Sequence, residues 1–135
     1  MCLTTKQLEP FKSENEITCY KVLRKNAFTL YQTPFQGDIV PLGVIRGKKP
    51  FIAEGEEQMK REYGFNLIKC GFIHTYTSEQ IAKDEAFFIK KKCGGKYDIF
   101  ECKIPANEPY FVSDDNREYC SKSIKFVKKV EYVEY

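Results

Sequence analysis

The alternation of hydrophobic and polar positions predicts a chain built from short β-strands around one principal helix. Segments rich in β-branched and aromatic residues, bounded by turn-forming residues, recur along the chain and are typical of strands. The expected strands cover residues 17–23, 27–32, 97–104, 109–112 and 118–133, with a turn at 113–116. Arg24-Lys25-Asn26 separates the first two, so we expect those two to form a hairpin.

Residues 66–75 show the clearest alternation, because Ile68, Cys70, Phe72, His74 and Tyr76 would share one face of a regular strand. We therefore expect a central strand there. Upstream, prolines and glycines interrupt the apolar segments and predict an irregular excursion, with short strands at 38–45 and 51–53. Residues 59–63 predict a short helical turn that Gly64 would end.

The principal helix is expected over about residues 78–93, because Thr77 and Gln80 have the spacing of a capping box and Gly94 follows as a terminator. At 100° per residue one arc of this helix would face the core. That arc holds Ile81, Ala82, Ala86, Phe88, Ile89 and Cys93. Glu85 falls inside the same arc, which predicts a largely buried carboxylate with a hydrogen-bonding partner from the sheet.

These elements predict an α+β fold with a mainly antiparallel sheet of about 6–8 short strands and one principal helix, since most connections are too short for parallel crossovers. The 135 residues are the length of one ordinary domain, so we expect a single domain over residues 1–135, with a polar lead-in over about residues 1–15. No segment approaches the apolar length that a membrane span requires, which argues against a membrane partner.

The six cysteines are widely spaced and mostly lie in apolar segments, where free cysteine packs as a small hydrophobe. The first residues lack the apolar core of a secretory signal, so we expect a cytoplasmic protein with reduced thiols. A single histidine and the absence of C-x-x-C argue against structural zinc, and no metal or resident cofactor is expected.

A net charge of +3 is too small to demand an anionic partner, but two basic clusters stand out. One holds Arg46, Lys48 and Lys49, and the other holds Lys90, Lys91, Lys92 and Lys96 around Gly94-Gly95. Clusters of this kind contact phosphates. Lysines at a helix C-terminus also complement the helix dipole, and this second explanation leads us to expect no nucleic-acid binding.

The candidate binding site is the junction where residues 74–78 pass from strand to helix. His74, Tyr76, Thr77 and Ser78 supply polar side chains beside a helix N-terminus, and Tyr20 on the opening strand would face them. Alternatively, His74 and Tyr76 pack under the excursion at 38–57 and are structural. Glu85 is a catalytic candidate on the same helix, although a structural bond is the simpler explanation for it.

Four blocks of sequence resemble a family of small uncharacterised bacterial and phage proteins. The blocks are Cys19-Tyr20-Lys21-Val22-Leu23, Gly71-Phe72-Ile73-His74-Thr75-Tyr76, Glu101-Cys102-Lys103-Ile104-Pro105 and Tyr119-Cys120-Ser121-Lys122-Ser123-Ile124. Their order also faintly resembles ADP-ribosyltransferase-like domains. That second resemblance implies a nicotinamide pocket lined by Tyr20, Tyr76, Ser78 and Glu118, with Glu118 as a catalytic candidate and NAD as a substrate.

Two functions from different classes therefore remain open. The first is a non-catalytic domain that binds a small molecule or a protein, in a bacterial or phage cytosolic protein. The second is an ADP-ribosyltransferase-like enzyme that uses a nicotinamide nucleotide. A site that brings Tyr20, Tyr76 and Glu118 together would favour the second, and wide separation of these side chains would exclude it.

Overall fold

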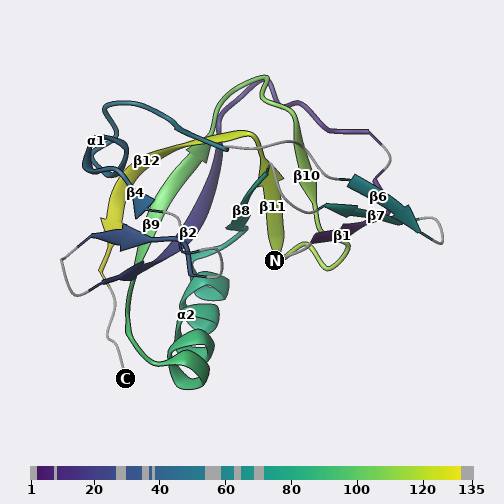
Figure 1. The fold of residues 1–135 in the computed structure, drawn as a ribbon. Helices are drawn as coiled ribbons and strands as arrows, with labels where there is room; N and C mark the ends of the chain where they lie inside the picture. The colour runs from purple at the N-terminus through teal and green to yellow at the C-terminus, as the bar shows by residue number, and fades with distance from the viewer. Residues whose placement is uncertain are drawn as a thin grey trace.

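The chain folds around a curved antiparallel sheet with one long helix on one face (Figure 1). The computed structural model describes residues 3–7, 9–26, 30–34, 37, 39–53, 59–62, 65–68 and 72–131, with the backbone alone for 59–62 and 65–68. The main sheet has the order β10 (Tyr110–Val112), β11 (Glu118–Ser121), β8 (Ile73–Tyr76), β2 (Ile17–Lys25), β9 (Lys96–Ile104), β12 (Ser123–Val130) and β5 (Phe51–Ile52). β3 (Tyr31–Gln32) pairs with the end of β2, and β4 (Ile39–Val40) pairs with β3.

A second, smaller sheet has the order β1 (Leu3–Thr5), β7 (Phe65–Ile68) and β6 (Met59–Glu62). The two helices are α1 (Leu42–Ile45) and α2 (Glu79–Cys93). The predicted α+β class with a mainly antiparallel sheet is confirmed, and the structure has more strands than predicted.

The main sheet is curled, and one continuous segment, β11 and β12, pairs with a different strand in each of its halves. Lys122 alone separates β11 from β12, yet β11 pairs with β8 and β12 pairs with β9. Figure 1 shows this segment arching over the top of the sheet. The largest hydrophobic core lies inside the curl and includes Cys19, Leu23, Phe100, Cys102, Ile104, Ile124 and Phe126.

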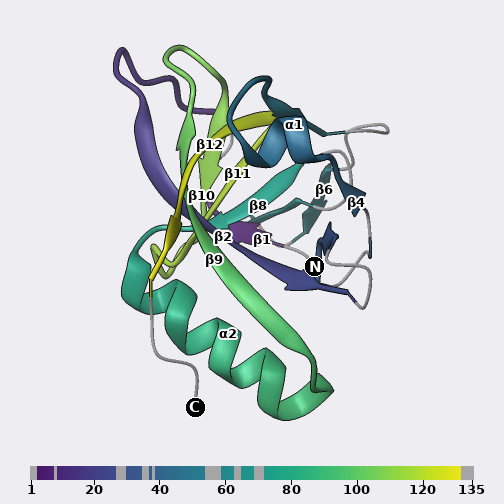
Figure 2. The same ribbon diagram turned by 90° about the vertical axis from the view of Figure 1, so that its left-hand side faces the viewer.

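Helix α2 covers the other face of the sheet and packs on β2 and β9 (Figure 2). It begins and ends as predicted, and Ser78 rather than Thr77 is the N-cap. The predicted inner face of α2 was wrong by a rotation of about 45° around the helix axis. The buried residues are Ala82, Ala86 and Ile89, whereas Phe88 is 62% exposed and Cys93 is exposed. Small alanines allow the helix to lie close to the strands, and the bulkier phenylalanine is left on the outside.

Several predicted strand boundaries also change. Residues 66–75 form no single strand, because β7 belongs to the small sheet and β8 to the main sheet. The predicted helical turn at 59–63 is wrong, since β6 occupies Met59–Glu62. The polar lead-in contains β1, whose Leu3 and Thr5 are buried, and the excursion contains α1.

The expected hairpin is partly confirmed, because Arg24 and Lys25 of β2 pair with Gln32 and Tyr31 of β3. The strand predicted at 97–104 is confirmed as β9, and the turn at 113–116 separates β10 from β11.

The four cysteines in the described part of the chain, Cys19, Cys93, Cys102 and Cys120, are free thiols. Cys2 and Cys70 lie outside the described residues.

Among the described residues, no helix has the length and apolar character needed to cross a membrane.

Candidate functional site

A row of four side chains crosses the sheet on the face that α2 covers. Tyr20 pairs with Tyr76, Tyr76 pairs with Glu118, and Tyr20 pairs with Glu101 on its other side. Residues directly opposite each other on antiparallel strands point to the same face. We call Glu118, Tyr76, Tyr20 and Glu101 the tyrosine row. It brings together three of the residues that the sequence singled out.

Glu118 is the least satisfied polar side chain of this row. Its Oε1 atom is buried and, within the described part of the chain, has no hydrogen-bond partner. The pKa of the Glu118 carboxyl is raised from 4.5 to about 7, first by burial and then by the negative charges of Asp115 and Glu85, whereas Arg117 and Lys21 act in the opposite direction. Near neutral pH this carboxyl therefore exists in both its charged and its protonated form.

The two tyrosines are neutral hydrogen-bonding groups. Burial, followed by the charges of Glu85 and Glu118, raises the pKa of Tyr76. The pKa of Tyr20 is raised by burial and then by Glu101 and Glu79. Each phenol therefore keeps its proton at neutral pH and can donate it in a hydrogen bond.

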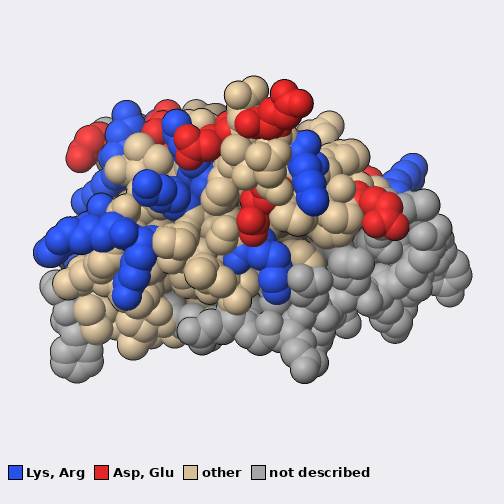
Figure 3. All heavy atoms as spheres, turned by 90° about the horizontal axis from the view of Figure 1, so that it is seen from above, with Lys and Arg blue, Asp and Glu red and all other residues tan. Residues whose placement is uncertain are grey.

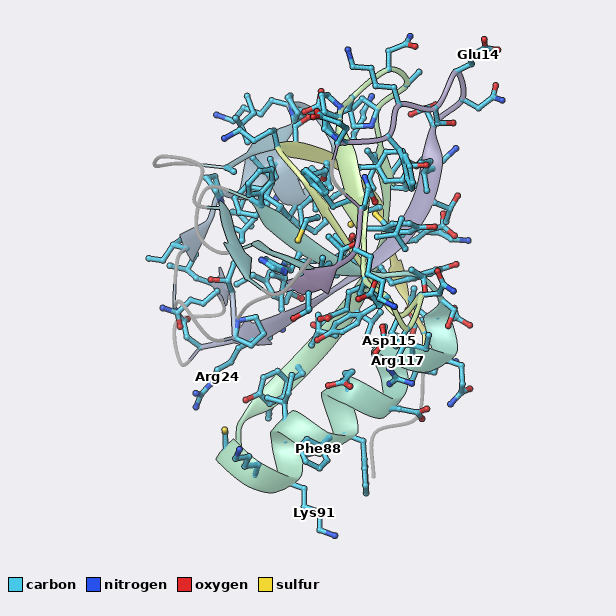
Figure 4. The ribbon with its side chains drawn as sticks, turned by 90° about the vertical axis from the view of Figure 1, so that its right-hand side faces the viewer. Glu14, Arg24, Phe88, Lys91, Asp115 and Arg117 are labelled. Carbon is cyan, nitrogen blue, oxygen red and sulfur yellow. The ribbon has the colours of Figure 1, made fainter. Side chains whose placement is uncertain are left out.

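Glu85 is only partly buried, so the prediction of a largely buried carboxylate was wrong. Its side chain is 32% exposed because the inner face of α2 is centred on Ala82 and Ala86, which leaves Glu85 at the margin. Its partner comes from the turn before β11 and not from a strand: Arg117 Nη2 lies 3.4 Å from Glu85 Oε1. Figure 4 shows Arg117 and Asp115 beside the N-terminal end of α2.

Thr77 and Ser78, which were predicted to bind a ligand, both make structural hydrogen bonds. Ser78 Oγ accepts from the Ile81 N–H at 3.2 Å and so caps α2. Thr77 Oγ1 donates to the Asn116 carbonyl at 2.7 Å, and the Thr77 N–H donates to the Arg117 carbonyl. These bonds fasten the turn at 113–117 to the start of α2 and thereby position Glu118.

His74 pairs with Cys120 across β8 and β11, and the Cys120 Sγ lies 3.2 Å from His74 Nδ1. Cys120 is fully buried against Leu3, Phe72 and Phe111, so its thiol has no access to a substrate. Together, these contacts favour a packing role for His74 over ligand binding.

Lys21 is a residue that the sequence analysis missed. It lies in the middle of β2, and its Nζ donates to the His74 carbonyl at 2.7 Å. Burial lowers its pKa, and the neighbouring thiols and Glu118 raise it. A lysine flanked by the apolar residues of Cys19–Leu23 was a visible signal that this strand carries a charge inward.

No family model, no curated protein and no solved structure matches this chain. The described residues also contain no group of three or more histidine, cysteine, aspartate or glutamate side chains arranged to hold a metal ion.

Proposed function

We propose that the protein binds a small organic molecule at the tyrosine row, as a domain of a bacterial or phage cytosolic protein. The observation that carries this proposal is the buried Oε1 of Glu118, which has no partner among the described residues. Leaving such an oxygen unsatisfied costs about 1–3 kcal/mol, and a ligand N–H or O–H would remove that cost. Tyr76 lies directly opposite Glu118 and Tyr20 directly opposite Tyr76, so two phenol hydroxyl groups belong to the same row.

The charges around Glu118 define the kind of ligand. Asp115 and Glu85 both raise its pKa, and Glu101 and Glu79 act on Tyr20 in the same sense. Arg117 carries a positive charge close to these carboxylates, and its Nη2 lies 3.4 Å from Glu85 Oε1 in an ion pair. A ligand anion would be repelled, so the site favours a flat organic group with a neutral amide or a cationic amidine.

Access to Glu118 would come through the pair formed by Arg117 and Glu85. The two side chains are 44% and 32% exposed, and a partly exposed ion pair opens at a cost of about 1 kcal/mol or less. A cationic ligand group would then take the place of the guanidinium beside the carboxylates.

The test is a titration of the full chain, followed by amide NMR, with benzamidine, benzamide, nicotinamide and benzoate as probes. Benzamidine and the two amides are expected to shift the signals of Glu118, Tyr76 and Tyr20, and benzoate is not. Glu118→Gln should weaken benzamidine binding by about 10-fold or more, because a hydrogen bond to a charged group is lost. Glu101→Gln, separated from Glu118 by two strands at the other end of the row, should weaken binding less. Equal binding of benzoate, or equal loss in both variants, would contradict the proposal.

ADP-ribosyl transfer from NAD is the second candidate, and the register supports it, because Tyr20, Tyr76 and Glu118 are neighbours on one face. A carboxylate there would stabilise the positive charge that develops on the ribose as the bond to nicotinamide breaks and nicotinamide leaves with the electron pair, while water or an acceptor hydroxyl bonds to the ribose carbon and loses its proton. Ser78, the fourth residue of the implied pocket, caps α2 instead. Release of nicotinamide from NAD by the wild type, and its loss in Glu118→Gln, would favour this candidate. Binding without release would favour the first.

A further inference from the structure

Five basic side chains from three elements lie at the end of the molecule opposite Glu118, with Arg24 on the sheet face that α2 covers and Lys25 and Lys96 on the opposite face. We call them the basic end: Arg24 and Lys25 end β2, Lys91 and Lys92 lie in the last turn of α2, and Lys96 begins β9. Figure 4 shows Arg24 beside the end of α2, where Lys91 also lies. The sequence analysis recognised only the lysines near α2, because the pairing of β2 with β9 brings the other two from a distant segment.

The fold holds these groups together although their charges repel. Lys25 and Lys96 are directly opposite each other on neighbouring strands, an arrangement that destabilises a sheet. Arg24 packs over the turn after α2: a Cβ on Gly95 would lie 3.0 Å from Arg24 Nε, and Gly95 has a φ of +99°. The positive φ favours glycine there, and a larger residue would also have to displace the arginine side chain.

No carboxylate in the described part of the chain forms an ion pair with any of these five side chains. The dipole of α2 explains Lys91 and Lys92. The dipole does not explain why β2 and β9 bring Arg24, Lys25 and Lys96 to the same end of the molecule, where Lys25 and Lys96 repel each other.

Two exposed phenylalanines accompany the basic end. Phe87 is 51% exposed and Phe88 is 62% exposed, and both lie away from the buried Ala82, Ala86 and Ile89 of α2. At 100° per residue they flank Lys91 on the outer side of the helix, where Figure 4 shows Phe88 and Lys91. Exposed aromatic rings beside lysines offer stacking surfaces next to positive charge.

We propose that the basic end binds single-stranded nucleic acid, a partner beyond the small molecule of the proposed function. The lysines and Arg24 would contact phosphates, and Phe87 and Phe88 would stack on bases, as in proteins that bind single strands without sequence preference. Five cations distributed over three elements fit an extended polyanion better than a single phosphate. A single strand fits better than a duplex because only unpaired bases expose their faces for stacking.

A second basic group provides the matched control. Arg46, Lys48 and Lys49 are exposed in the segment that follows α1, and Lys125 is exposed on β12. Seen from above (Figure 3), Lys and Arg side chains gather on the side where α1 and β12 lie. Neither Phe87 nor Phe88 lies there, so this group has charge without the exposed phenylalanines of α2.

The test is fluorescence anisotropy of a labelled oligothymidylate of about twelve nucleotides with the full chain at several salt concentrations. For about four phosphate contacts, log K should fall against log salt with a slope of about −3. The double variant Lys91→Gln/Lys92→Gln should reduce that slope by about 1.4. Phe88→Ala should weaken binding by about 5- to 100-fold at an unchanged slope. The control Lys48→Gln/Lys49→Gln should leave both quantities unchanged.

Three results would overturn this proposal, provided that circular dichroism shows every variant to be folded. The first is the absence of binding at about 50 mM salt, where such contacts are strong. The second is an equal loss of affinity in the Lys48/Lys49 control, which would assign the effect to overall charge. The third is an unchanged affinity in Phe88→Ala together with equal competition by polyglutamate, which would indicate an acidic protein as the partner.

Discussion

Replacing Glu118 with glutamine should change how the stability of the protein depends on pH. The folded structure raises the pKa of this carboxyl from the ordinary 4.5 to about 7, chiefly through burial. The folded protein therefore holds the proton more tightly than the unfolded chain between these two pH values. By linkage, the contribution of Glu118 to the free energy of unfolding is largest below pH 4.5, falls as the pH rises to about 7, and is then constant.

The magnitude follows from the same interval. One unit of pKa corresponds to about 1.4 kcal/mol, so the interval from 4.5 to about 7 sets an upper limit of about 3.5 kcal/mol. Glu118 is only half-buried, and solvent screens its charge. We therefore expect the wild type to lose about 1–2 kcal/mol between pH 5 and pH 8 relative to Glu118→Gln.

Urea denaturation at pH 5, 6, 7 and 8 measures this difference, and comparing the two proteins cancels the contributions of titrating groups that do not interact with Glu118. The reasoning is refuted if Glu118→Gln follows the wild type at every pH. It is also refuted if the wild type gains stability over the variant as the pH rises, because a charged Glu118 would then be paired.

Three further predictions concern the surroundings of the site. Ser78→Ala should destabilise the protein by about 1 kcal/mol in chemical denaturation, because the cap of α2 is lost, and a change below about 0.3 kcal/mol would contradict the cap. Glu85→Ala should cost no more than about 1 kcal/mol, since its pair with Arg117 is partly exposed; a loss above about 2 kcal/mol would restore the buried carboxylate that the sequence predicted. A thiol count on freshly prepared, denatured protein should find all six cysteines free, and a reproducible loss of two thiols would reveal a disulfide.

The fold was predictable from sequence where local signals were strong. The capping-box spacing at Thr77 predicted the start of α2 to within one residue of its N-cap Ser78, Gly94 predicted its end, and the apolar alternation of β9 defines its strand. The phase of α2 was predicted wrongly because Phe88 is more hydrophobic than Ala86, and the close approach of helix and sheet selects small residues. The separation of β7 from β8 was not predictable, since both segments are apolar and only their partners differ.

The candidate site was predictable in part. Tyr20, Tyr76 and Glu118 lie side by side because of the strand register, which is a non-local property. The hydroxyls of Thr77 and Ser78 were assigned to a ligand because the sequence does not show that nearby backbone groups use them. The basic end was missed because its residues come from segments that only the pairing of β2 with β9 brings together.

The most direct test of the ligand site is the pKa of Glu118, measured by NMR of the side-chain carboxyl carbon with and without benzamidine. Without the probe, the signal should titrate near 7, the value that burial and the neighbouring carboxylates produce. With a saturating cation bound beside it, the titration should move at least one unit lower, because the charged form gains a partner. A Glu118 that titrates near its ordinary 4.5 without the probe, or that is unaffected while benzamidine binds elsewhere, would contradict the account.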